Sequence, residues 1–137
     1  MTYLKRMAIG TFLVGVSLIA QAHHSYAMFD TTRQVVVHGT VQNVEWVSPH
    51  VWIFLMVDSG DGKMVPYGFE TLSPGQLLRD FNWKRNSLNT GDKIEVTYAP
   101  LRSGQPGGGL IKAVLGDGHV LETRMSRAIE GGTPNPQ

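Results

Sequence analysis

Residues 35–57 read VVVHGTVQNVEWVSPHVWIFLMV and contain the two patterns that decide the fold. An apolar residue or glycine stands at every second position from Val35 to Val41, which is the period of a half-buried β-strand. The period then slips by one residue near Gln42, which predicts a β-bulge that bends this strand. From Val51 to Val57 every residue is apolar, which indicates a well-covered strand or a strand whose aromatic face turns to a ligand.

Three more strands and one helix are expected further along the chain. Residues 63–70 follow a strong turn signal at residues 58–62. Ser73-Pro74 provides an N-cap and a first-turn proline for a short helix, and strands are expected over 93–98 and 110–115. This order predicts an all-β protein with a small α contribution, a five-stranded OB-like β-barrel with a short helix between strands 3 and 4. A generic antiparallel β-sandwich is the alternative.

The N-terminal segment has the features of a cleaved export signal. Two basic residues precede an apolar run over residues 7–20, and Ala20 and Ala22 are the small residues that a signal peptidase requires. The run is shorter than the roughly 20 apolar residues of a membrane-spanning helix. We therefore expect cleavage after Ala22, a periplasmic mature protein and no transmembrane segment after cleavage. Cleavage after Ala27 is the alternative.

Cleavage after Ala22 changes the composition that bears on function. Removing residues 1–22 leaves 115 of the 137 residues and takes away two of the 12 basic residues, so the formal net charge changes from +1 to −1. This balance argues against nucleic acid as a partner, because its binding depends on neutralising phosphates. We expect an N-terminal arm over 23–32, the barrel domain over 33–122 and a disordered tail over 123–137.

Three histidines form the leading candidate site. Cleavage at the expected bond gives His23 a free α-amine beside its imidazole, and His24 or His50 can supply a further nitrogen. Flat sets of nitrogen donors suit Cu(II), with zinc the less favoured metal, and cysteine is absent. Glu45 and Glu70 are candidates to hold the rings in place. The alternative is that the first two histidines lie in a flexible arm and the third only packs at a strand end.

Trp46, Trp52 and Phe54 form a second candidate site. If alternate residues of the apolar strand face the core, Trp52 and Phe54 point outward, on the face where OB-folds bind oligonucleotides or sugars. Tyr67 and Phe69 are expected to lie beside them. The alternative is that the N-terminal arm or a partner subunit covers these rings. The sequence contains no nucleophile motif, phosphate loop or paired catalytic acids, so we expect a protein that binds a metal ion or an envelope protein and is not an enzyme.

Four segments resemble a family of small exported bacterial proteins, the domain of unknown function 6152. They are His23-His24-Ser25, residues 44–52, residues 70–74 and residues 83–92. The resemblance extends to about Leu121, and its most distinctive part is the Glu-Trp-x-x-Pro-His pattern, in which Ser48 stands where the family usually has asparagine. It implies a periplasmic, β-rich domain without an established activity. His50 falls within the resembling segments, as does the histidine pair, whereas His38 and His119 do not and are expected at the surface.

Overall fold

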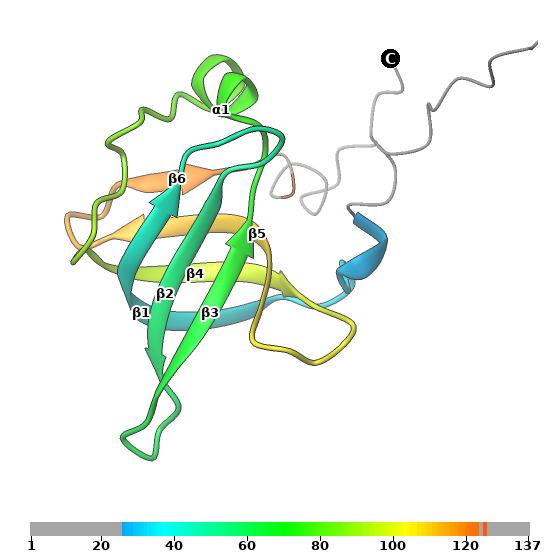
Figure 1. The fold of residues 1–137 in the computed structure, drawn as a ribbon, viewed down its shortest axis with the longest axis vertical. Helices are drawn as coiled ribbons and strands as arrows, with labels where there is room; N and C mark the ends of the chain where they lie inside the picture. Colours follow the sequence, from blue (N-terminus) through cyan, green and yellow to red (C-terminus); the bar gives the residue numbers. More distant parts are fainter. Residues whose placement is uncertain (1–25, 124, 126–137) are drawn as a thin grey trace, which may run out of the picture.

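Six strands and two short helical segments make up residues 26–123 and residue 125, the part of the chain that this computed structural model describes (Figure 1). In chain order they are η1 (Tyr26–Met28), β1 (Val35–Glu45), β2 (Trp52–Asp58), β3 (Met64–Glu70), α1 (Pro74–Asp80), β4 (Lys93–Pro100), β5 (Gly107–Leu115) and β6 (Val120–Glu122). The helix lies between β3 and β4, as the sequence predicts. Within these residues, no helix is long and apolar enough to cross a membrane.

Five of the strands close into a barrel. The sheet order is β3-β2-β1-β4-β5-β6, and neighbours in this order run antiparallel. A parallel pairing of β3 with β5, from Gly68 opposite Gly107 to Glu70 opposite Gly109, joins the two sides. Figure 1 shows the resulting arrangement, with β1, β2 and β3 in front of β4 and β5. The predicted OB-like barrel is confirmed, and the β-sandwich alternative is wrong. β6 is an additional strand that pairs only with β5.

The predicted bulge bends β1 in the place that the sequence indicates. Val41 pairs with Leu55 of β2, whereas Asn43 pairs with Phe54, so the register shifts by one residue between them. Residues 39–45 pair with β2 and residues 35–40 pair with β4. The bend thus allows this one long strand to pair with β2 on one side of the barrel and with β4 on the other.

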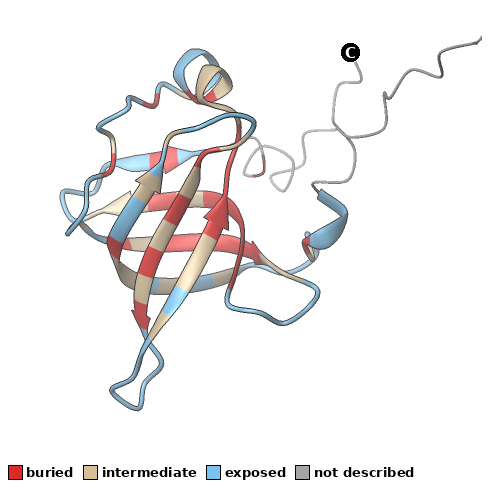
Figure 2. Cartoon of the chain, viewed as in Figure 1, coloured by how far each residue is buried: buried red, intermediate tan, exposed pale blue. Residues whose placement is uncertain are grey.

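Alternate residues of β2 and the residue before it fill the core. Val51, Ile53 and Leu55 are fully buried, whereas Trp52 and Phe54 between them are partly exposed on the outer surface (Figure 2). The apolar run from residue 51 to residue 57 is therefore a strand with one buried face and one aromatic outer face. The outward aromatic face is the geometry that the second of the two interpretations requires, and its binding of a ligand stays a prediction.

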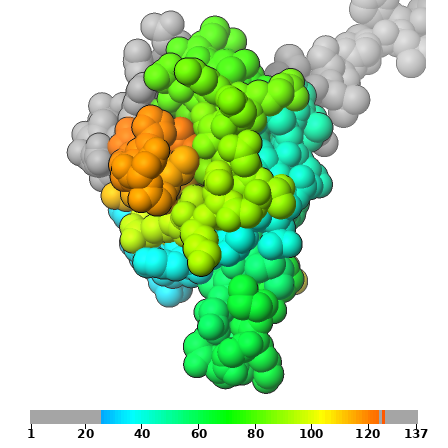
Figure 3. All heavy atoms as spheres, turned by 90° about the vertical axis from the view of Figure 1, so that its left-hand side faces the viewer, coloured from blue at the N-terminus to red at the C-terminus, as the bar shows by residue number. Residues whose placement is uncertain are grey.

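α1 and the segment after it close one end of the barrel. The N-cap Ser73 and Gln76 form a capping box, with Pro74 in the first turn, which confirms the predicted helix start. The indole Nε1–H of Trp83 donates to the carbonyl of Glu122 at 2.8 Å and so ties the segment after α1 to β6. Figure 3 shows β6 in orange beside the residues that follow α1, and the green β2–β3 hairpin projecting from the opposite end.

Glycines at the start of β5 allow the barrel to close. The sequence suggests a loop up to Gly109, but β5 already begins at Gly107. A Cβ atom on Gly107 would lie 2.1 Å from the carbonyl oxygen of Gly68, and a Cβ on Gly108 would lie 2.0 Å from that of Ala99. Only glycine permits both neighbouring strands to approach β5 this closely.

A second apolar cluster covers the outer face of β4 and β5. Its buried members are Phe29, Ala99, Ile111 and Met125, and Leu101 packs against them. Thr123 is also buried and its hydroxyl donates to the carbonyl of Leu110 at 2.6 Å. The packed part of the chain thus includes Phe29 of the expected arm, and Thr123 and Met125 of the expected tail. The predicted signal segment, residues 23–25 and residues 126–137 lie outside the described residues.

Candidate functional site

His50 lies at the break between β1 and β2, and the backbone next to it is firmly held. Val51 donates its N–H to the carbonyl of Leu72 at 2.9 Å and accepts from the N–H of Thr71 at 3.0 Å. The hydroxyl of Thr71 donates to the same Val51 carbonyl at 2.9 Å. These three bonds join the start of β2 to the residues that follow β3, and they fix His50 beside the end of β3.

The imidazole of His50 contacts the carboxylate of Glu70. The contact joins Nδ1 of His50 to Oε1 of Glu70. The Glu70 side chain is 8% exposed and the His50 side chain is 32% exposed. A carboxylate that accepts the Nδ1–H of a histidine fixes both the tautomer and the direction of the ring. In the neutral form of such a ring, Nε2 is the nitrogen with the free lone pair. Among the described residues, no side chain or carbonyl forms a hydrogen bond with Nε2.

Glu45, the other carboxylate expected to orient a ring, lies elsewhere. It is exposed at the end of β1, opposite Trp52, and Trp52 in turn is opposite Glu70. The indole therefore stands between the two carboxylates, and none of the ion pairs in the described part of the chain involves Glu45. His23 and His24 lie outside the described residues. Of the five predicted metal-site residues, the structure brings together His50 and Glu70.

Trp52 and Phe54 form an aromatic pair on the outer face of β2. Their ring centroids are 6.3 Å apart and their planes differ by 15°. A Cβ atom on Gly68, the β3 residue opposite Phe54, would lie 3.5 Å from the Phe54 ring and 3.9 Å from the Trp52 ring. Both rings therefore pack over the bare backbone of Gly68. We call Trp52, Phe54 and Gly68 the aromatic platform.

The other predicted aromatic residues are not part of the platform. Trp46 packs partly against the core, and the Arg85 guanidinium lies 6.0 Å from its ring centroid, at the outer limit of a cation–π contact. Phe69 is fully buried and packs edge-on against Tyr98, with centroids 5.0 Å apart. Tyr67 packs against the same core. Tyr67 and Phe69 were expected beside Trp52, but alternation along β3 turns them to the inner face.

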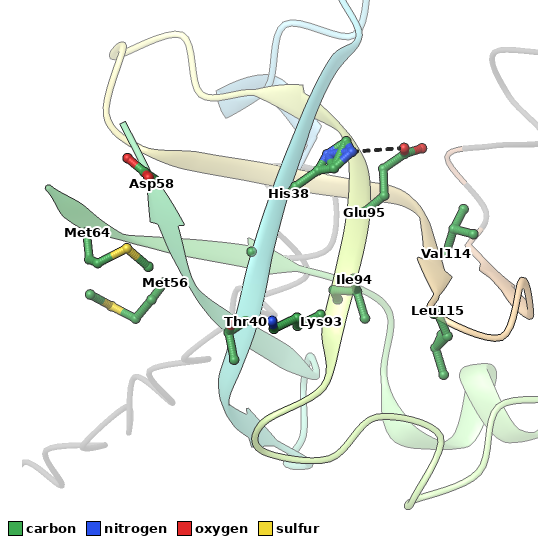
Figure 4. A pocket seen from close by; sticks show the side chains of 12 residues that line it. His38, Thr40, Met56, Asp58, Met64, Lys93, Ile94, Glu95, Val114 and Leu115 are labelled. Atoms are coloured by element: carbon green, nitrogen blue, oxygen red, sulfur yellow. Dashed lines mark ion pairs between the residues drawn. The ribbon is translucent and has the colours of Figure 1, made fainter. Parts of the chain in front are cut away.

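The structure also has an open pocket of about 510 Å³, which the sequence does not predict (Figure 4). Its lining residues are His38, Gly39, Thr40, Met56, Asp58, Met64, Lys93, Ile94, Glu95, Val114, Leu115 and Gly116. Met56 follows Phe54 on the outer face of β2 and is opposite Thr40, which is opposite Lys93 of β4. The pocket and the platform thus share one face.

The two remaining described histidines are at the surface, as predicted. His38 is 72% exposed, and its Nε2 lies 3.4 Å from a carboxylate oxygen of Glu95 across the pocket (Figure 4). His119 is exposed in the turn before β6, where its N–H donates to the side chain of Asp117 at 2.9 Å. The His38–Glu95 pair resembles the His50–Glu70 pair in composition, but its carboxylate is not buried.

Residues 11–110 of the chain match the model of a family of unknown function, DUF6152. The chain belongs to this family. No curated protein and no solved structure matches it. The residues that the DUF6152 model matches include the His50–Glu70 pair and the whole aromatic platform, so both lie within the family's own domain. Because the family has no assigned activity, the function has to be argued from these two features.

Proposed function

We propose that this DUF6152 protein is an exported periplasmic protein that binds Cu(II) at the His50 end of the barrel. The donors are Nε2 of His50 and the α-amine and imidazole of His23 at the processed N-terminus, with His24 as the alternative imidazole. Zinc is the weaker candidate, because three nitrogens in a flat arrangement suit Cu(II) better. The role is to hold the ion for buffering or transfer, and we propose binding without catalysis.

The observation that carries this proposal is the contact of His50 with a buried carboxylate. Histidine ligands of metals commonly donate their second ring N–H to a carboxylate, which orients the ring and raises its basicity. Glu70 makes this contact through Nδ1 and thereby leaves Nε2 for a metal. Its negative charge, almost fully removed from water, also favours a cation bound on the far side of the ring.

The position of Phe29 supports the reach of the N-terminal residues. Phe29 packs on the outer side of β5, where a Cβ atom on Gly109 would lie 3.0 Å from its ring. Gly109 is the register partner of Glu70 on the adjacent strand, which is about 4.8 Å away. Five residues separate His23 from Phe29, and the last three of them form the 3-10 helix η1, so only the chain before Tyr26 is free to extend, by up to about 10 Å. The proposal requires this short segment to bring His23 to Nε2 of His50.

The proposal requires donors beyond the described residues. Within residues 26–123 and residue 125, no group of three or more histidine, aspartate or glutamate side chains could hold a metal ion. One oriented imidazole alone binds Cu(II) weakly, and the processed N-terminus supplies the other nitrogens. Affinity should fall as the pH is lowered, because protonated imidazoles and amines do not bind metals.

The test begins with the mass of the exported protein, which must correspond to a chain starting at His23. Cu(II) is then titrated against the wild type and His50→Ala in the presence of a competing chelator. We expect at least a tenfold loss of affinity in His50→Ala. His38→Ala is the matched control, because His38 also contacts a carboxylate but lies in the pocket. A mature chain that starts at Met28, or equal affinity in the wild type and His50→Ala, would refute the proposal.

The aromatic platform favours a second function, the binding of a non-metal ligand or an envelope partner. Its supporting observation is the pair of nearly parallel, partly exposed rings of Trp52 and Phe54. In that case Trp52→Ala abolishes binding of the ligand and leaves the affinity for Cu(II) within twofold of the wild type. Loss of both activities in Trp52→Ala, with the fold intact, would show that the two sites are one.

A further inference from the structure

The aromatic platform and the open pocket form one continuous binding face. Trp52, Phe54 and Met56 follow one another at every second position on the outer side of β2, so they span about 13 Å along the strand. The first two belong to the platform and the third lines the pocket. The exposed side chains of this face thus form an elongated row along β2, with two flat rings at one end.

The charge of this face excludes an anionic polymer. The charged residues of β1, β2, β3 and β4, apart from His38, are Glu45, Asp58, Glu70, Lys93 and Glu95. These strands thus carry four carboxylates and one ammonium group, and the two carboxylates of Glu45 and Glu70 lie opposite Trp52. Nucleic acids bind mainly through the neutralisation of their phosphates by basic side chains, which this face does not offer.

Polar groups border the rings on the β1 side. Asn43 is opposite Phe54, Glu45 is opposite Trp52, and both are exposed. Thr40 and His38 continue this border into the pocket (Figure 4). The border thus combines an amide, a carboxylate, a hydroxyl and an imidazole, which together donate and accept hydrogen bonds.

From these features we infer that the face binds a neutral, linear oligosaccharide. The C–H face of a pyranose ring is apolar and packs on a flat aromatic ring, while its hydroxyl groups lie at the rim and need donors and acceptors. Two consecutive aromatic rings fit two consecutive sugar rings, and the polar border of β1 faces their hydroxyl groups. This inference rests on the second proposed function, the platform as a ligand site, and does not depend on copper.

The experiment titrates the mature protein with neutral hexasaccharides and follows amide and indole NMR signals. The probes are β-1,4-linked N-acetylglucosamine, cellohexaose, maltohexaose and β-1,4-mannohexaose, with a thymidine oligonucleotide as the anionic comparison. We expect at least one hexasaccharide to shift the indole signal of Trp52 and the amides of residues 40–56. Trp52→Ala and Phe54→Ala should each weaken that binding at least tenfold. Trp52→Leu and Phe54→Leu, which keep an apolar side chain without a flat ring, keep the test decisive if an alanine variant does not fold.

Leu78→Ala is the matched control, because Leu78 is 50% exposed on α1 and lies outside this face. It should bind the hexasaccharide as the wild type does, and so should His50→Ala. The inference is overturned if no hexasaccharide binds, if Phe54→Leu and Trp52→Leu bind as tightly as the wild type, or if the oligonucleotide binds more tightly. It is also overturned if the shifts reflect only self-association at higher protein concentration. Titration with Cu(II) is independent of these outcomes, so the two proposals fail separately.

Discussion

Replacing Glu70 separates the two contributions that its carboxylate makes to the proposed copper site. Glu70→Gln removes the charge but keeps an oxygen that can accept the Nδ1–H of His50. Glu70→Ala removes both the charge and the acceptor, so the ring can rotate and Nδ1 can compete with Nε2 for the metal. Comparison of the two variants therefore separates the contribution of the charge to Cu(II) affinity from the contribution of the ring orientation.

The size of the charge contribution follows from the geometry. A metal on Nε2 lies roughly 6 Å from a carboxylate that accepts from Nδ1, given ordinary metal–nitrogen and hydrogen-bond lengths. For a divalent ion at this distance, Coulomb's law gives about 1.4 kcal/mol in water and about 5.5 kcal/mol at an effective dielectric constant of 20. The Glu70 side chain is 8% exposed and the His50 ring is 32% exposed, so the value lies between these limits. We expect about a tenfold loss of Cu(II) affinity in Glu70→Gln and about a hundredfold loss in Glu70→Ala.

The assay is a competition titration of the mature protein with a chelator of known Cu(II) affinity, at one pH and one ionic strength. Electron paramagnetic resonance of the loaded variants reports the number of nitrogen donors, which should fall in Glu70→Ala. Glu95→Ala is the matched control, because Glu95 contacts the exposed His38 at 3.4 Å. If Glu70→Ala binds Cu(II) within twofold of Glu95→Ala while both remain folded, the carboxylate does not support a metal at His50 and the reasoning fails.

Three further predictions concern the barrel itself. Gly107→Ala should lower the free energy of unfolding in urea by about 3 kcal/mol, because its Cβ would lie 2.1 Å from the Gly68 carbonyl oxygen and its φ is +118°. Gly116→Ala is the control. No atom lies within 4 Å of its Cβ, so it should change the free energy of unfolding by less than about 0.5 kcal/mol. Gly68→Ala should raise the free energy of unfolding by about 0.4–1 kcal/mol, because its Cβ makes an ordinary contact with Phe54 at 3.5 Å; a loss of stability in the same urea assay would contradict this. Burial raises the pKa of the Tyr98 hydroxyl, so the folded state keeps the phenolic proton at a pH where the unfolded state has lost it. The melting temperature should therefore decline above about pH 10, and it should decline less steeply in Tyr98→Phe.

Much of the fold follows from local patterns in the sequence. The phase slip at Gln42 predicts the bulge in β1, and Ser73-Pro74 predicts the start of α1, because each depends on neighbouring residues only. The parallel pairing of β3 with β5 is different. It depends on close contact between strands about 40 residues apart, at Gly68 and Gly107, and a run of glycines is equally typical of a loop. The length of β5 was therefore underestimated.

The candidate site could be predicted in part, and the part that was missed follows from strand register. Glu70 was proposed to orient a histidine, but the sequence did not show that it meets His50. The turn after Asp58 contains the information, since a hairpin that pairs Asp58 with Met64 also pairs Trp52 with Glu70. The pocket does not follow from this register alone, because its lining comes from five strands, β1 to β5, whose order is set only by barrel closure.

The two proposed sites meet at Trp52, so binding at one is expected to affect binding at the other. Glu70 holds His50 on one side, and its own register partner on β2 is Trp52, the first ring of the aromatic platform. An oligosaccharide over Trp52 would further remove the Glu70 carboxylate from water and strengthen its interaction with a cation on the His50 ring. Binding free energies are reciprocal, so bound copper must then favour the oligosaccharide by the same factor. The alternation that buries Ile53 and Leu55 in the core therefore also turns Trp52 and Phe54 outward, next to the Glu70 carboxylate that holds the proposed metal ligand His50.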